Sequence, residues 1–388
     1  MRTFLIAFGL ALHLAVAIWN GFFGPSFGAE GDALEFHREA QYYAENLENF
    51  EYETGWIYSY ALGVLYAVFF TDHIFFGSII SVFAWLVSAI LFGRILDCYN
   101  GSDRYKEISM ALFCIWPTML LNTSVTLREV FQVLAINMIL LASLRIFVQN
   151  QNRWTLLIAG MILGSVLHGT LLAFSAGIFA LLVYFYINSA SGATKAARMT
   201  FGIAFGMVGI FIVLSLFGVI AYDVDDGLVA AIQSYNEGAI AANARADYRT
   251  EGFIEGPYDL IIFLPTAFFQ YMLEPLPANV GTVADMLLFM ENLARLLLII
   301  IAIRGIFRAD GITRKALLFS FLAYLALEAL WSVGTVNWGT ASRHHVPAMG
   351  LLLSIAFYEP IRSRLKKSKA GDGARQYSNY DNRKRSAY

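Results

Sequence analysis

Long apolar runs separated by short polar stretches recur along almost the whole chain. A helix needs about 20 residues to cross the hydrocarbon core of a bilayer, and ten runs meet or approach that length. They cover residues 3–22, 74–95, 107–122, 130–147, 154–168, 171–188, 199–221, 286–304, 316–333 and 345–358. The pattern predicts an all-α, polytopic integral membrane protein with about ten transmembrane helices.

Two further apolar stretches are shorter. Residues 56–70, "WIYSYALGVLYAVFF", are rich in aromatic residues, and residues 260–273, "LIIFLPTAFFQYML", are interrupted by Pro265. We expect both to form re-entrant or interfacial helices. Residues 1–360 would then be one membrane domain with loops 23–73 and 222–285 on its outer side. The first run could instead be a cleaved signal peptide, but it is longer than a typical signal core, so a span is favoured.

The charged residues give this layout an orientation. The chain is 58% hydrophobic and only 14% charged, against about 25% charged in soluble proteins. With the N-terminus in the cytoplasm and both short stretches outside, all seven Lys and 14 of the 20 Arg lie on the cytoplasmic side, as the positive-inside rule requires. We therefore expect a multi-pass protein of the cell (inner) membrane with both termini in the cytoplasm.

Two regions gain a role from this orientation. The tail, residues 361–388, is basic and too poor in apolar residues to fold alone. It is predicted to be a disordered cytoplasmic segment that binds anionic lipid headgroups or docks a partner. By contrast, 21 of the 29 acidic residues fall in outer loops or at outer helix ends. A chemical site is therefore expected on the extracytoplasmic face.

The first outer loop carries the stretch "GDALEFHREAQYY". Asp32 follows Gly31 at the predicted start of a helix, and Glu35, His37 and Tyr42 come within the next turns. Asp32 could cap the helix or act as a base held just above the bilayer, and the sequence leaves both roles open. The later acids of the loop are more typical of the solvated face of an amphipathic helix.

Polar residues also stand at the mouths of the next spans. Arg128 and Glu129 follow "NTSVTL" between two apolar runs, and His168 lies at an outward hairpin. Charges in such positions are costly unless they are paired or wetted, so each is a candidate site residue. The alternatives are an ordinary helix start, capped by Thr126 or Ser124 with Glu129 facing the helix dipole, and a polar helix tip for His168.

Near the C-terminus, "GTVNWGTASRHHVPAMG" places Arg343, His344 and His345 just before the last span, with Pro347 suited to its first turn. Arginine binds phosphate through a bidentate fork, and a helix N-terminus adds N–H donors. An accidental charge pair near lipid headgroups is the alternative. A zinc site is disfavoured because adjacent histidines need distant ligands, and the two cysteines lack metal-ligand spacing.

Taken together, "GDALEFH", the Tyr-rich helix after it, the Arg-Glu pair and "RHHVP" resemble the GT-C superfamily of polytopic glycosyltransferases. The resemblance implies that Asp32 is the base that deprotonates the acceptor and that Glu129 binds metal or acceptor. It implies that Arg343 holds the lipid-linked phosphate, with Arg128 as a helper. The paired Asp-X-Asp motif of metal-dependent members is missing, so a divalent metal is possible but no ligand is assigned.

The expected activity is transfer of a sugar from a polyprenyl-phosphate-linked donor to a hydroxyl of a glycan, lipid or protein outside the cytoplasm. His344 would add to the phosphate site, and the acceptor would contact Glu35, His37, Tyr42 and His168. No nucleic-acid partner is expected. A surface-polysaccharide polymerase or ligase, a lipid-linked sugar flippase or transporter, and a non-catalytic assembly subunit are the alternatives. Loop 222–259 is either an acceptor-gating lid or a plain flexible loop.

Overall fold

The computed structural model describes residues 1–25, 31–49, 55–189, 246–249 and 259–360. Within these ranges the regular structure is helical, and the only β-type pairings are isolated bridges, Gly101 with Pro360 and Asp247 with Asn337. The α-helices are α1 (Arg2–Phe22), α2 (Asp32–Glu45), α3 (Ile57–Phe69), α4 (Ile74–Cys98), α5 (Asp103–Ile115), α6 (Pro117–Thr123), α7 (Glu129–Phe147), α8 (Trp154–Leu167), α9 (Gly169–Asn188), α12 (Asp259–Leu273), α13 (Val283–Arg308), α14 (Gly311–Gly334) and α15 (Trp338–Ala356), with 3₁₀ turns η1 (Leu47–Asn49) and η3 (Pro277–Asn279).

Six of the described helices, α1, α4, α7, α9, α13 and α14, are long and apolar enough to cross a membrane. Three shorter apolar helical segments, Ile57–Phe69, Trp154–Leu167 and Ile262–Leu273, accompany them. The chain is therefore a polytopic helical membrane protein. The predicted span 199–221, nearly all of loop 222–259 and the tail 361–388 lie outside the described residues.

Two predicted spans have different boundaries in the structure. The run 107–122 is not one helix: α5 ends and α6 begins around Trp116, because Pro117 has no N–H for the helix ladder and suits only a first turn. The last helix begins at Trp338 and not at 345, with the Asn337 side chain accepting the N–H of Thr340 as its cap. Pro347 is consequently inside α15 and not in its first turn.

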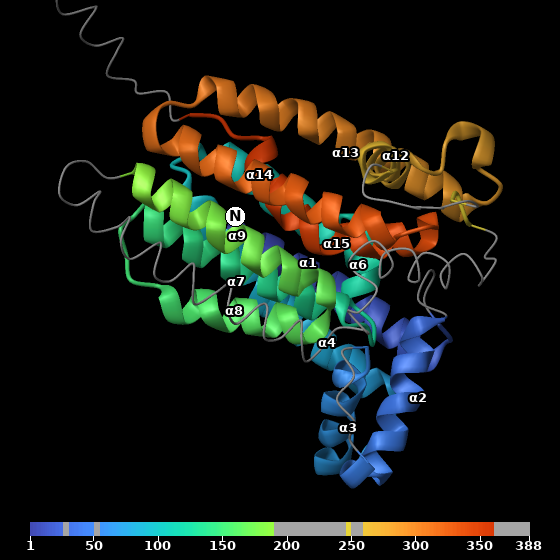
Figure 1. The fold of residues 1–388 in the computed structure, drawn as a ribbon. Coiled ribbons are helices and arrows are strands. Elements are labelled where there is room, and N and C mark those ends of the chain that lie inside the picture. The colour runs from blue at the N-terminus through green and yellow to red at the C-terminus, as the bar shows by residue number, and fades with distance from the viewer. Residues whose placement is uncertain (26–30, 50–54, 190–245, 250–258, 361–388) are drawn as a thin grey trace, which may run out of the picture.

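The long helices form one bundle around α7, which packs against α8, α4 and α15. Figure 1 shows α13 and α14 on one side of this bundle and α8 and α9 on the other, all running in roughly the same direction. Most residues of α7 and α15 are buried. The two helices therefore form the centre of the bundle, on which the other helices pack.

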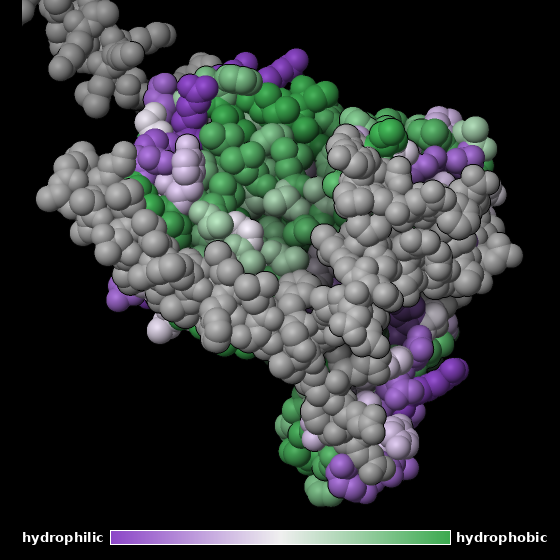
Figure 2. Space-filling model, viewed as in Figure 1, coloured by the Kyte–Doolittle hydropathy of each residue, from purple (hydrophilic) through white to green (hydrophobic). Residues whose placement is uncertain are grey.

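Helices α2 and α3 form a hairpin that projects from one end of the bundle, across the direction of the long helices (Figure 1). They approach closely at Gly63, where a Cβ atom would stand 2.7 Å from the carbonyl oxygen of Ala40. Figure 2 shows hydrophobic residues on the α3 side of the hairpin and hydrophilic residues on the α2 side. We call the end of the bundle from which the hairpin projects the α2 end.

Candidate functional site

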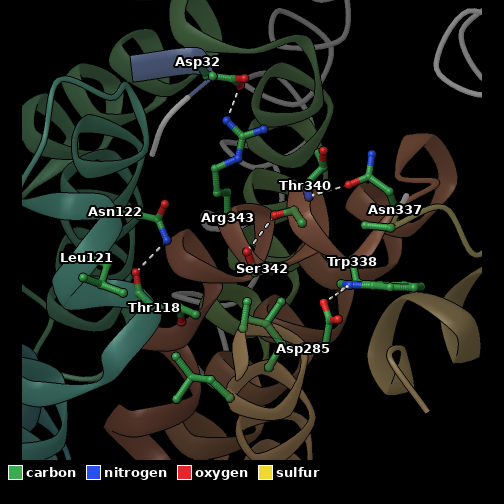
Figure 3. Close-up of a pocket in the computed structure, with 16 residues that line it drawn as sticks. Asp32, Thr118, Leu121, Asn122, Asp285, Asn337, Trp338, Thr340, Ser342 and Arg343 are labelled. Carbon is green, nitrogen blue, oxygen red and sulfur yellow. Dashed lines mark hydrogen bonds and ion pairs between the residues drawn. The ribbon is translucent and has the colours of Figure 1, made fainter. Parts of the chain in front are cut away.

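A cavity of about 400 Å³ lies at the α2 end, between the start of α2, α6, the start of α13 and the first turns of α15. Figure 3 shows its polar lining, which includes Asp32, Thr118, Asn122, Asp285 and Arg343. Its remaining wall is largely apolar and contains leucines of α6 and α13. The cavity therefore combines hydrogen-bonding groups with hydrocarbon, the mixture that suits a small polar headgroup.

Asp32 and Arg343 meet across this cavity. Arg343 donates a hydrogen bond from Nη1 to Oδ2 of Asp32, which joins the first turn of α2 to the second turn of α15 (Figure 3). The side chain of Asp32 is 44% exposed and that of Arg343 is 16% exposed. The N-cap of α2 is Gly31, without a side-chain cap, so the alternative in which Asp32 caps the helix is wrong.

Arg128, His168 and His344 gather beside Arg343. The rings of His168 and His344 lie 4.4 and 4.0 Å from the ring of Trp331 and 6.0 Å from each other. Arg128 reaches the carbonyl oxygen of Leu167, next to His168, and both arginine charges act on His344. Three predicted phosphate-binding residues are thus close together, and His168, predicted on the acceptor side, lies with them. Of these four residues only Arg343 lines the cavity.

Hydrogen bonds assign the tautomers of the two histidines. The N–H of Thr170 donates to Nδ1 of His168, so Nδ1 carries no hydrogen and Nε2–H is a donor. Thr335 donates its hydroxyl hydrogen to the carbonyl oxygen of Trp331, so His344 Nδ1–H donates to Thr335 Oγ1 and leaves Nε2 as an acceptor. Burial, with a smaller contribution from Arg128, lowers the pKa of His168 to about 3. His168 is therefore a neutral donor at physiological pH.

Glu129 is the first residue of α7 and is only 4% exposed. Its Oε2 has no hydrogen-bond partner among the described residues. The expected caps do not form, because the hydroxyls of Ser124 and Thr126 donate to the carbonyl oxygens of Leu120 and Ile74. The predicted cap is therefore wrong, whereas Glu129 does lie in the first turn of α7, at the positive end of the helix dipole. Glu129 is a buried carboxylate with one unused oxygen, and it does not line the cavity.

The structure separates the other α2 residues from the cavity. Glu35 is exposed, and the side chain of Tyr42 is 48% exposed. His37 is half-buried and forms a hydrogen bond of 2.9 Å between its Nδ1 and the hydroxyl of Tyr66 in α3. Burial is the main cause of the lowered pKa of His37, which the charge of Asp72 partly opposes. None of these three predicted acceptor residues lines the cavity.

Sequence reasoning missed several residues of the cavity. Asp285 is 1% exposed and accepts hydrogen bonds from the N–H groups of Gly281 and Thr282 and from the indole of Trp338. It closes the capping box of α13 with Thr282. The Thr-x-x-Asp spacing at the start of an apolar run was the available signal. Ala246, within the predicted lid, also lines the cavity, and its carbonyl oxygen accepts the N–H of Trp338.

A second polar group lies deeper in the bundle. Glu291 and Arg295 of α13, Glu328 of α14 and His345 of α15 are all at most 5% exposed. The group is buried where α13, α14 and α15 pack together. The four-residue spacing of Glu291 and Arg295, which places both on one helix face, was the sequence signal for this group.

Among the described residues, no three His, Cys, Asp or Glu side chains gather closely enough to hold a metal ion. The comparisons with known proteins add no relative: no family model, no curated protein and no solved structure matches this chain. The proposals below therefore depend on the sequence and the geometry of the chain itself.

Proposed function

We propose that this protein is a membrane glycosyltransferase of the GT-C type, which moves a sugar from a polyprenyl-phosphate-linked donor to an acceptor hydroxyl on the extracytoplasmic side. The observation that carries the proposal is the meeting of Asp32 and Arg343 at one cavity. They are 311 positions apart in the sequence, and they provide the carboxylate and the guanidinium that the reaction needs.

The position of the cavity suits a lipid-linked donor. It lies at the end of the long apolar helices, next to a hairpin whose α3 exposes Val68, Phe69 and Phe70 while α2 carries acids. A hairpin of this kind is suited to the membrane interface, with its apolar side in lipid and its polar side in water. A donor whose tail stays in the bilayer would present its phosphate at this level.

Arg343 and Arg128 would neutralise the leaving phosphate, and the N–H of neutral His168 could donate to a phosphate oxygen. In the free protein Arg343 is paired with Asp32, so donor binding would exchange that carboxylate for a phosphate. The exchange frees Asp32 to accept the proton of the acceptor hydroxyl. The acceptor oxygen bonds to the anomeric carbon, the bond from that carbon to the phosphate oxygen breaks, and polyprenyl phosphate leaves.

His344 fits a different role from the one predicted for it. Its Nε2 is an acceptor in the tautomer that Thr335 fixes, and a lone pair repels a phosphate oxygen. It can accept a hydrogen bond from a sugar or acceptor hydroxyl instead. Glu129 follows Arg128 in the chain and does not line the cavity. Its unused carboxylate oxygen would orient that arginine or a hydroxyl of the donor.

The test is transfer from a radiolabelled polyprenyl-phosphate sugar pool to endogenous acceptor, in membranes that carry matched amounts of each variant. Asp32→Asn should abolish transfer while donor still binds, and Arg343→Ala should weaken donor binding. Glu45→Gln and Arg38→Ala, which remove exposed charges of the same helix as Asp32, are the matched controls and should transfer normally. Transfer at the wild-type rate by both site variants would overturn the proposal.

One observation favours a second candidate, a transporter or flippase of lipid-linked sugars. Transporters carry ionisable groups inside the bilayer, and the buried group of Glu291, Arg295, Glu328 and His345 is of this kind. A transporter would move labelled donor across sealed vesicles without forming a glycosylated product. Product formation in detergent, where no compartment exists, distinguishes the transferase from it.

A further inference from the structure

Helices α12, α13, α14 and α15 enclose a polar cluster that the proposed transfer reaction does not use. Its core is Glu328, which is fully buried, and His345, which is 2% exposed. Arg295, Tyr271 and Tyr324 surround this pair, and each is at most 1% exposed. Ionisable groups inside the membrane domain of a protein are expensive and usually functional.

The hydrogen-bond geometry fixes how many protons the pair holds. Nε2 of His345 is 3.3 Å from the carbonyl oxygen of Tyr271, and a carbonyl can only accept, so Nε2 carries a hydrogen. Nδ1 is 2.7 Å from Oε2 of Glu328, a contact that requires one hydrogen between the two atoms. The pair is either imidazolium with carboxylate or imidazole with carboxylic acid, and in both forms it shares one proton and has no net charge.

Arg295 and Glu328 act on that proton in opposite directions, because Arg295 disfavours it on His345 and Glu328 favours it. Arg295 is the cation that acts on His345, and Glu291, one turn earlier on α13, compensates Arg295. Glu291 itself accepts the N–H and the hydroxyl of Thr118 at 2.9 and 2.7 Å. Loss of the shared proton would leave one uncompensated negative charge in the interior, and a second proton would place a cation beside Arg295.

Four atoms around the pair have no hydrogen-bond partner among the described residues: Glu328 Oε1, Arg295 Nε, Tyr271 Oη and Tyr324 Oη. The carboxylate oxygen can only accept, the guanidinium N–H can only donate, and the two hydroxyls can do both. Both tyrosines lie close enough to Glu328 to interact with its charge and to approach it as hydrogen-bond donors. This combination matches the two donors and two acceptors of a water molecule.

We propose that Glu328 and His345 form an internal proton-binding site, and that Tyr271, Tyr324 and Arg295 hold water against it. The site is connected to the cavity through Thr118 and through α15. Thr118, which lines the cavity, donates to Glu291, and Arg343, which also lines it, is two residues before His345 on α15. An anion in the cavity would thus be felt by the shared proton through a short path of polar groups.

Solid-state NMR of the full chain in liposomes, with ¹⁵N-labelled histidine, tests the site directly. The chain has six histidines, and the signal that His345→Gln removes identifies the ring. In the wild type we expect a protonated Nε2, an Nδ1 shift between those of a bare and a protonated nitrogen, and no change between about pH 5 and pH 8. Magnetisation transfer from water should reach this ring.

Glu328→Gln should move the Nδ1 signal to the position of a bare acceptor, whereas the exposed Glu45→Gln should leave it unchanged. The wild-type spectrum alone tests the proposal, so the experiment is informative even if Glu328→Gln does not fold. A wild-type Nδ1 with the shift of a nitrogen that forms no hydrogen bond, or a ring that titrates with the bulk pH, would overturn the shared proton. Absence of magnetisation transfer from water would overturn the hydrated site.

Discussion

Helix α15 contributes one residue to each of two acid–base pairs, which differ in their exposure to solvent. Arg343 pairs with Asp32, whose side chain is 44% exposed, while His345, two residues later, pairs with Glu328, which is fully buried. Residues two apart on a helix point to different sides, so one helix serves both an open cavity and the buried interior. The difference in solvent exposure decides what each pair can do.

An ion pair in contact with water is worth about 0–1 kcal/mol, so a ligand can replace one partner at little cost. A buried pair is different, because removing one partner leaves the other without compensation, at a cost of about 3–5 kcal/mol. The Asp32–Arg343 pair is therefore suited to exchange during a reaction. The Glu328–His345 pair is suited to hold a proton and a fixed packing.

The largest effect is expected from breaking the buried pair. Glu328→Leu should lower the free energy of unfolding by about 3–5 kcal/mol, because it leaves His345 and the water-binding groups unpaired. Denaturant or thermal unfolding in lipid nanodiscs measures this. Arg343→Ala, the matched change in the exposed pair, should cost no more than about 1 kcal/mol.

The double variant Glu328→Leu with His345→Leu sharpens the same point. Replacing both partners by apolar residues removes the uncompensated group, so much of the lost stability should return. A double variant as unstable as the sum of its two single variants would contradict the account of a self-neutralising pair.

The next largest effect separates chemistry from stability at the exposed pair. Asp32→Asn should reduce the rate of sugar transfer by about 10²-fold or more, the usual contribution of a positioned general base. Its free energy of unfolding should change by less than about 1 kcal/mol, since the pair is solvated. A variant that loses stability and activity in parallel would indicate a structural role for Asp32.

A smaller effect concerns pH. The pKa of His168 is about 3 in the folded protein and about 6.5 in an unfolded chain, so the unfolded state binds one more proton between these values. Stability contributed by neutral His168 is present above about pH 6.5 and is lost as the pH falls, by about 1.4 kcal/mol per unit.

His168→Asn isolates this contribution. An asparagine oxygen can still cap α9 by accepting the N–H of Thr170, so stability at about pH 8 should change little. The slope of stability against pH below 6.5 should fall by about 1.4 kcal/mol per unit. An unchanged slope in urea titrations at several pH values would mean that His168 is not held neutral.

The sequence predicted the helical membrane architecture and placed Asp32 and Arg343 on the same side of the membrane, but it predicted neither their ion pair nor the second pair. Hydropathy detects long apolar helices such as α4 and α13 because a long continuous run of apolar residues is visible in the sequence itself. It does not detect the start of α15, because "WGTAS" is only moderately apolar and its helix is stabilised by the Asn337 cap and by packing.

Partners on different helices leave no local pattern in the sequence. Glu328 and His345 are 17 positions apart on two helices, and the sequence around either residue does not indicate its partner. For the same reason, the sequence assigned Glu35, His37 and Tyr42 to the site on proximity to Asp32 alone. In the α2–α3 hairpin, whose helices approach closely at Gly63, these three residues lie away from the cavity.

The smallest expected effect tests whether the hairpin rests on lipid. Phe70 is 97% exposed in a left-handed turn at the end of α3, so Phe70→Asn should change the free energy of unfolding by no more than about 0.5 kcal/mol. If this end of α3 contacts the bilayer, the variant should reduce quenching of tryptophan fluorescence by brominated lipid. Leu47→Asn, at an exposed position after α2 on the polar side, is the control and should leave quenching unchanged. Equal quenching in wild type and Phe70→Asn would place this end of α3 in water and weaken the case for a donor site at the membrane interface.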